Sequence, residues 1–134
     1  MQSATATPDD HTVALRLPAA PTACADARRA VRDLCHLKSL DRITDDAQLL
    51  TSELVSNAVR YSTDQVTVRA SSAVDGLTVT VTDDGQVPTA PNALRRSPAS
   101  LPTVTSEQGR GLYLVDRLAA DWGSGEHTVW FRLA

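Results

Sequence analysis

Three short segments of this chain carry residue types that can act on a bound nucleotide. Glu53 and Asn57 lie four positions apart, so on a helix they project from one face and can converge on one metal-bound phosphate. Asp83 ends an alternating apolar run, and Gly85 comes two positions after it. A carboxylate at a strand end can accept a hydrogen bond from the exocyclic amine of a base. A glycine-rich turn that feeds a helix offers free backbone N–H groups to an anion, and here it consists of Gly109, Arg110, Gly111 and Leu112.

Each of these signals is weak when it is taken alone. A Glu and an Asn one turn apart are most often a solvated helix face, and Asp-x-Gly is usually a simple turn. Gly-x-Gly by itself is scarcely better than chance. The order of the three segments, their spacing and the elements on which they lie together predict an ATP site.

The elements that must position these residues begin with a strand in which Val13, Leu15 and Leu17 alternate. A helix is expected over residues 22–37, and a second over 44–61. Thr44 is the expected N-cap of the second helix, with two aspartates after it near the positive end of the helix dipole. This second helix carries Glu53 and Asn57 beside its apolar stripe.

The second half of the chain adds a hairpin, a long connection, a helix and a strand. Apolar residues alternate over 66–68 and 77–81, and a turn containing Asp75 and Gly76 joins these two strands. Residues 86–108 lack periodicity, which in a compact domain is typical of a functional or disordered segment. A helix is expected from Gly111, followed by a strand over 128–133. This element order predicts an α/β two-layer sandwich, with helices on one face of a mixed, largely antiparallel sheet.

Length and composition indicate one small domain. A chain of 134 residues with 42% hydrophobic content can bury one core. Residues 1–11 are expected to be disordered, and they lack the basic and apolar blocks of a signal peptide, as the rest lacks a run of roughly 20 apolar residues. We therefore expect a cytoplasmic protein with no membrane contact. The net charge of −3 offers no general attraction to nucleic acid, so a transcriptional role would act through protein partners.

The cysteines and tryptophans are predicted to be packing residues. Cys24 and Cys35 lie eleven residues apart on one helix, roughly 16 Å, which is beyond the roughly 7 Å Cα limit of a disulfide. A free cysteine packs as a small hydrophobe. Trp122 and Trp130 are expected in the core or at a sheet edge rather than stacked on a base.

At this level of detail the chain resembles the histidine-kinase-like (GHKL, Bergerat-fold) ATPases, and most closely their anti-sigma-factor serine/threonine kinase branch. The segment Glu53 to Ser62 is similar to the N box of that family, and Val81 to Gly85 to its first glycine box. Glu107 to Val115 resembles the second glycine box, and Gly125 to Phe131 the closing strand. The resemblance covers residues 12–133 and places an ATP lid at 86–108.

The resemblance implies a role for each site residue. Asn57 would hold Mg²⁺, which bridges the phosphates of ATP, and Glu53 would be the general base for a partner's hydroxyl. Asp83 would accept from the adenine amine, and Gly85 would let the backbone approach the base. Thr128 would support the base pocket. Phosphate would be held by the backbone amides around Gly109, Arg110, Gly111 and Leu112.

The implied function is an anti-sigma factor that sequesters a sigma factor and phosphorylates an antagonist protein. The first strand and first helix are expected near a homodimer or partner surface. The alternative is a regulatory module that captures a partner without phosphate transfer. Glu53 favours the kinase, whereas the lid favours the module, because Val87 and Pro88 stand where many relatives have a second glycine. Arg95 and Arg96 in the lid are either solvated charges or partners of the γ-phosphate. A fragment of a two-component histidine kinase fits least, because no helix with a phosphoacceptor histidine is expected before the domain.

The closing segment also departs from the family. Glu126 and His127 replace the Gly and Lys that are common in relatives, while Thr128 is retained.

Overall fold

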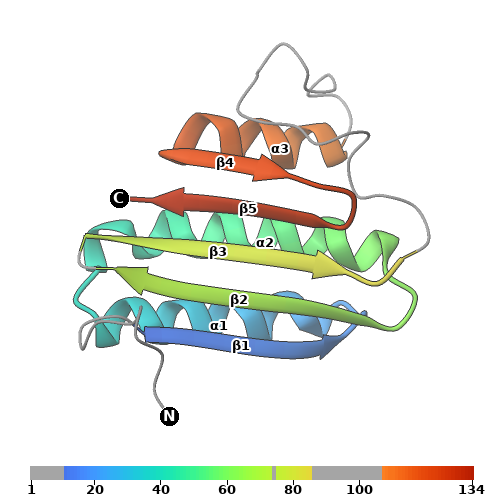
Figure 1. Ribbon diagram of the computed structural model, residues 1–134, viewed down its shortest axis with the longest axis horizontal. Coiled ribbons are helices and arrows are strands. Elements are labelled where there is room, and N and C mark those ends of the chain that lie inside the picture. Colours follow the sequence, from blue (N-terminus) through green and yellow to red (C-terminus); the bar gives the residue numbers. More distant parts are fainter. Residues whose placement is uncertain (1–10, 74, 86–106) are drawn as a thin grey trace.

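The computed structural model describes residues 11–73, 75–85 and 107–134, with 107–111 described by their backbone. A five-stranded sheet forms one layer, and the helices pack behind it as the second layer (Figure 1). The two-layer sandwich that was expected is confirmed. The strands are β1 (His11–Pro18), β2 (Gln65–Ala73), β3 (Gly76–Asp83), β4 (Asp121–Ser124) and β5 (Thr128–Leu133). The helices are α1 (Thr22–Leu37), the short 3-10 helix η1 (Asp41–Ile43), α2 (Thr44–Tyr61) and α3 (Glu107–Leu118).

The strands lie in the order β1-β2-β3-β5-β4, and the four pairs that the structure describes are all antiparallel. The expectation of a mixed sheet was therefore wrong in that detail. The central register aligns Val81 of β3 with Val68 on one side and Val129 on the other. The N-terminal part of the chain thus forms one edge of the sheet, and β4 forms the other.

Side chains alternate along the strands, so one face of the sheet is buried and the other is partly exposed. Val68, Val81 and Val129 are buried beneath the helices. Their strand neighbours point the opposite way and include Thr80 and Trp130, which are only partly covered. Trp130 lies across from Gly123 of β4, where an added Cβ would come within 2.8 Å of the indole nitrogen.

Helix α1 packs on β1 and β2, and α2 packs on β2, β3 and β5, so together they close the core on one face of the sheet. The predicted stripe of α2 is buried at Leu50, Leu54 and Ala58. Both cysteines are free, with Cys35 completely buried and Cys24 packed at the edge of the core, so their prediction as packing residues is confirmed. Burial raises the pKa of both thiols. Trp122 is fully buried as well, and its Nε1 donates to Asp116 at 2.9 Å.

Several local expectations were wrong. Thr44 is not an N-cap, because η1 runs directly into α2 and gives Thr44 helical backbone angles; its hydroxyl donates backward to the carbonyl of Leu40 at 3.2 Å. Helix α3 begins at Glu107 rather than near Gly111. Gly76 belongs to β3, where it pairs with Ala73.

Two elements were not expected at all. The edge strand β4 and the single turn η1 are too short to show a hydrophobic period. His11, expected in the N-terminal tail, is the first residue of β1. Residues 1–10 and most of the expected lid lie outside the described residues, including Val87, Pro88, Arg95 and Arg96. In the part of the chain that is described, no helix has the length and apolar content needed to cross a bilayer.

Candidate functional site

The C-terminal half of α2 brings two of the predicted site residues to one pocket. Glu53 and Asn57 line it together with Leu54 from the same helix, Leu112 from α3 and Val129 from β5. The pocket contains about 210 Å³ of empty space, part of it open to solvent. The expectation that Glu53 and Asn57 face the same side of a helix is confirmed, because spacing of four residues places them one turn apart. Leu112 joins them across the gap between α2 and α3.

Asn57 carries an unsatisfied buried oxygen in this pocket. Its Oδ1 atom is inaccessible to solvent, and no residue that the structure describes donates a hydrogen bond to it. Burying an amide oxygen without a donor costs free energy, so most such atoms in folded proteins have partners. An amide oxygen is also a ligand that Mg²⁺ accepts. The amide oxygen of Asn57 is therefore a suitable ligand for a hard cation such as Mg²⁺.

Glu53 has a carboxylate without a hydrogen-bond partner among the residues that the structure describes. Its side chain is half-buried at the pocket, and no hydrogen bond or ion pair joins it to any residue in the described ranges. A carboxylate that held the helix in place would be expected to have donors around it. The arrangement leaves Glu53 able to accept a proton from a group that enters the pocket.

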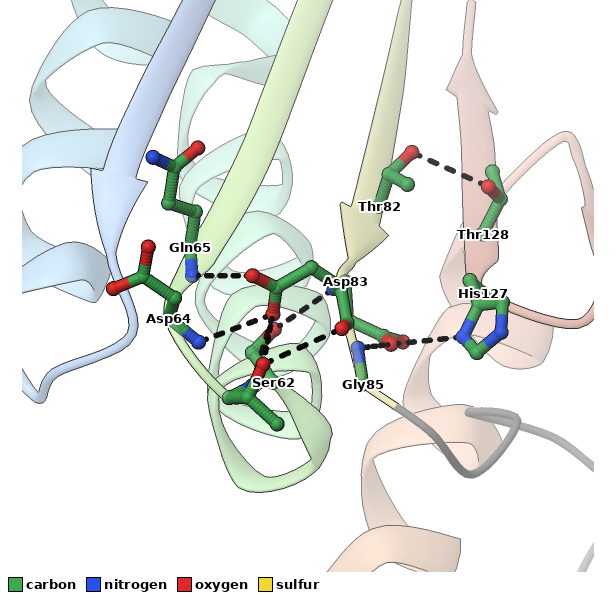
Figure 2. Close-up of polar contacts among 10 residues, drawn as sticks. Ser62, Asp64, Gln65, Thr82, Asp83, Gly85, His127 and Thr128 are labelled. Atoms are coloured by element: carbon green, nitrogen blue, oxygen red, sulfur yellow. Dashed lines mark hydrogen bonds and ion pairs between the residues drawn. The ribbon is translucent and has the colours of Figure 1, made fainter.

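Asp83 lies at the end of β3 with its side chain fully removed from solvent. Its Oδ1 accepts a hydrogen bond from the backbone N–H of Gly85 at 2.9 Å, and it lies 3.0 Å from Nδ1 of His127 (Figure 2). The backbone N–H of Asp83 also donates to the carbonyl of His127 at 2.9 Å. The predicted base acceptor is therefore held by the residue before β5.

His127 was not predicted as a site residue. The antiparallel register that pairs Thr82 with Thr128 continues by one position and sets His127 beside Asp83. That register depends on which strands are neighbours, which the sequence alone does not show. The only sequence signal was the replacement of a common lysine by histidine at this position.

Asp84 fastens the segment after α2, and this role was also not predicted. Its Oδ2 accepts from the backbone N–H of Gln65 at 2.9 Å, and its Oδ1 accepts from those of Thr63 at 2.9 Å and Asp64 at 3.2 Å (Figure 2). These donors, with that of Gln65 the strongest, lower the pKa of Asp84 below its ordinary value. The carboxylate thus connects the end of β3 with the start of β2.

Gly85 is needed for a close contact with α2. A Cβ added at this position would overlap the carbonyl oxygen of Tyr61, the last residue of the helix. Backbone Asp84 N–H also donates to Ser62 Oγ at 3.4 Å. Asp84 and Gly85 together fix the end of β3, which holds Asp83, against the end of α2, which holds Asn57.

The other predicted site residues, Thr128 and the glycine-rich segment of residues 109–111, lie on β5 and α3. The hydroxyl of Thr128 is 3.2 Å from that of Thr82, on the face that strand alternation turns away from the helices, whereas its neighbour Val129 lines the pocket. Gly109, Arg110 and Gly111 lie in the first turns of α3 rather than in a turn before it. Backbone N–H groups in the first turn of a helix have no partner within the helix, so those at the start of α3 could bind an anion. A nucleotide contact by Thr128 or by these amides remains a prediction.

Comparison with known protein families supports one assignment. The sequence model described as the histidine kinase-like ATPase domain matches residues 17–132, which includes every described element from the end of β1 to the end of β5 except the last residue. Among curated proteins, none matches the chain.

Proposed function

Because this chain belongs to the histidine kinase-like ATPase family, we propose that it is an anti-sigma factor with serine/threonine protein kinase activity. Domains of this family bind ATP, usually together with Mg²⁺. The observation that carries the kinase assignment is that the carboxylate of Glu53 and the amide oxygen of Asn57 share a pocket and have no hydrogen-bond partner among the described residues. The chemistry that this pair supports is transfer of the γ-phosphoryl group of ATP to a hydroxyl of a partner protein.

Asn57 would hold Mg²⁺ through Oδ1. The described residues contain no group of three or more His, Cys, Asp or Glu side chains that could hold a metal by themselves. The ion would therefore share its coordination between this amide oxygen and phosphate oxygens, as Mg²⁺ commonly does in phosphoryl-transfer sites. When bound, the ion supplies positive charge that offsets the charge of the phosphates.

Glu53 would act as the general base. A base must lie within reach of the proton that it takes, and phosphoryl transfer depends mainly on positioning. Glu53 lies one helical turn before Asn57 on the same side of α2 and has no competing donor in the described ranges. The carboxylate is thus placed to receive the proton of a serine or threonine hydroxyl that approaches the phosphate.

Asp83 would recognise the base. An ionised carboxylate accepts hydrogen bonds only, so it fits the exocyclic amine of adenine. Gly85 supports this role indirectly, because its close contact with Tyr61 fixes the position of Asp83 relative to α2.

The anti-sigma assignment rests on the sequence. The N-box segment begins with Glu53, and the closing strand has a Thr-Val-Trp run over 128–130, both of which resemble the serine/threonine kinase branch. The negative net charge fits partners that are proteins rather than nucleic acid. The partners proposed are a sigma factor and an antagonist protein that receives the phosphate.

The direct test is a phosphate-transfer assay. The full chain would be incubated with γ-labelled ATP, Mg²⁺ and candidate antagonist proteins, in parallel with reactions that contain EDTA. We expect label on a serine or threonine of one antagonist, and none when Mg²⁺ is removed. ATP binding without transfer to any antagonist that forms a complex with the chain would instead indicate a module that only captures its partner.

A further inference from the structure

We propose that His127 is a specificity-determining positioning residue for the nucleotide base, a role that rests on the proposed ATP site. Its ring holds the carboxylate of Asp83 as an acceptor, and this selects purines with a 6-amino group over those with a 6-oxo group. His127 itself need not touch the base for this effect.

The geometry gives the imidazole a defined task. Nδ1 of His127 lies 3.0 Å from Oδ1 of Asp83, and the backbone of His127 accepts from the N–H of Asp83 at 2.9 Å. A carboxylate can only accept, so Nδ1 must carry the proton in this contact. The neutral Nδ1–H tautomer and the imidazolium both satisfy this condition. The histidine is thus bound to Asp83 by both its side chain and its main chain.

Burial makes these donors important. The side chain of Asp83 has no solvent exposure, whereas the ring of His127 keeps about a third of its surface exposed, 34%. Water therefore does not reach the carboxylate, and protein donors must replace it. Among the described residues, Gly85 and His127 both donate to Oδ1, and together they fix the orientation of the carboxylate.

The position of the Asp83 carboxylate decides how well it discriminates between bases. A carboxylate that only accepts hydrogen bonds pairs with the 6-amino group of adenine and opposes the carbonyl oxygen of hypoxanthine or guanine. Sites built around such a hydrogen bond discriminate strongly, because a wrong partner leaves a buried polar group unpaired. By donating to Asp83, His127 holds the carboxylate where it can accept from the 6-amino group.

A second histidine–aspartate pair shows what the contact looks like without this function. Nδ1 of His36 lies 3.1 Å from Oδ1 of Asp41, a nearly identical distance. Both side chains are more than half exposed there, at 57% and 74%. Water already reaches the Asp41 carboxylate, whereas the Asp83 carboxylate is covered by protein. The pair of His36 and Asp41 therefore provides a matched control.

The experiment compares ATP with inosine triphosphate, which differs by a 6-oxo group in place of the 6-amino group. Dissociation constants for both nucleotides with Mg²⁺ would be measured by calorimetry for the full chain. His127→Ala and His127→Leu remove the donor, the second with less loss of volume. His127→Asn keeps an N–H donor near the position of Nδ1. His36→Ala is the control, and the thermal midpoint of each variant shows whether it is folded.

We expect the two variants without a donor to lose roughly tenfold of the preference for ATP over inosine triphosphate, the size expected for one lost bond to a buried acceptor. His127→Asn should recover most of the preference, and His36→Ala should retain all of it. In an Asp83→Asn background the His127→Ala change should have no further effect on the preference, because the carboxylate through which it acts is gone.

Two outcomes overturn parts of the argument separately. If the wild-type chain binds ATP and the ratio of the two dissociation constants is unchanged in His127→Ala and His127→Leu, His127 has no role in specificity. A loss of thermal stability without a change in that ratio would also exclude a role of His127 in specificity, because a contact that only stabilises the fold would give this result. If the wild-type chain binds neither nucleotide, the proposed function fails first and the inference fails with it.

Discussion

Two buried oxygens on helix α2 both lack a hydrogen-bond partner among the described residues, but their surroundings differ. Thr51 Oγ1 and Asn57 Oδ1 are both inaccessible to solvent, and neither has a hydrogen-bond partner among the residues that the structure describes. Thr51 is completely buried in the core half of the helix, with no exposed surface. Asn57 lies less than two turns later, half-buried, and lines the pocket that contains Glu53.

The difference shows when an unsatisfied polar atom indicates function. Each oxygen lost its hydration on folding and gained no hydrogen bond from the described residues, so each costs stability. At Asn57 a ligand can enter and use the oxygen, together with a carboxylate one turn away. At Thr51 the surroundings are packed side chains and no ligand has access. The location beside a pocket, rather than the missing hydrogen bond alone, supports the functional interpretation.

The largest expected effect comes from Glu53. Glu53→Gln keeps the volume of the side chain but removes the proton acceptor, so phosphate transfer to the partner protein should fall roughly 10²–10⁴-fold. Folding stability and most of the ATP affinity should remain, because no hydrogen bond or ion pair to the described residues is lost. The measurement is the rate of labelled phosphate transfer with saturating ATP.

Asp46→Asn is the matched control for this change. Asp46 is exposed near the start of the same helix, and its replacement also removes one negative charge. Transfer at the wild-type rate in Glu53→Gln would reject the general-base role. A loss of folding in Glu53→Gln would show that its carboxylate is structural, in contrast to Asn57 and Thr51, whose oxygens have no such function in the fold.

Asn57 should show a smaller effect, confined to binding. Asn57→Ala removes the oxygen that is proposed to hold Mg²⁺, so ATP affinity in the presence of Mg²⁺ should fall roughly tenfold to a hundredfold, by analogy with other lost bonds to charged groups. The free energy of unfolding without nucleotide should change little, because the amide oxygen makes no hydrogen bond to the described residues. Calorimetric titration with and without Mg²⁺ and denaturant unfolding measure the two quantities.

Ser56→Ala, an exposed position next to Asn57, controls for a change in the helix itself. Equal losses of affinity with and without Mg²⁺ in Asn57→Ala would contradict a role at the metal. A large loss of stability without nucleotide would place Asn57 among the structural residues and remove its contrast with Thr51.

The third prediction concerns the connection that holds the functional half of α2 to the sheet. Asp84→Asn loses one of the two acceptor oxygens that bind the backbone N–H groups of residues 63–65, so the variant should be less stable than the wild type at neutral pH. These donors lower the pKa of Asp84 in the folded state. The stabilisation is therefore present above the unfolded-state pKa and is lost as the pH falls through the folded-state pKa.

Denaturant unfolding of both proteins at several pH values measures this dependence. The difference in stability should be constant from pH 7 to about pH 5 and should shrink below about pH 4, near the ordinary pKa of an aspartate. A difference that does not change with pH would mean that the carboxylate charge is not what holds this turn. Asp64→Asn is a suitable control, because the Asp64 side chain is exposed and its backbone N–H, which reaches Asp84, is retained.

The elements that sequence reasoning located correctly are those with a repeated local pattern. Helices α1 and α2 begin and end at the predicted residues, since their apolar stripes run for several turns. Strand β4 has four residues and contains Gly123, so it shows no alternation, and its pairing with β5 depends on the rest of the sheet. The N-cap at Thr44 was wrong because the preceding turn η1 is itself helical.

The candidate site follows the same division. Glu53 and Asn57 were predicted to share a face because four residues of helix place them there regardless of the rest of the fold. The contact of His127 with Asp83 depends on the neighbour relation of β3 and β5, and these residues are 44 positions apart. The role of Asp84 depends on backbone N–H groups, which carry no residue-specific signal in the sequence. Local spacing thus predicted the pair on α2, while the supporting contacts required the folded chain.

The smallest expected effect tests the other member of the comparison. Thr51→Val replaces the unsatisfied hydroxyl by a methyl group of nearly the same shape, so it should raise the free energy of unfolding by about 1 kcal/mol, the cost of leaving such a group buried without a partner. Thr and Val have similar helix propensities, so the helix itself contributes little to the difference. ATP affinity and phosphate transfer should be unchanged, since Thr51 does not line the pocket. Thr44→Val is the matched control on the same helix: its buried hydroxyl donates to Leu40, so the same replacement should lower stability there. Equal destabilisation by both changes would mean that the hydroxyl of Thr51 has a partner in solution, and the two oxygens of α2 would then differ in more than their access to the pocket.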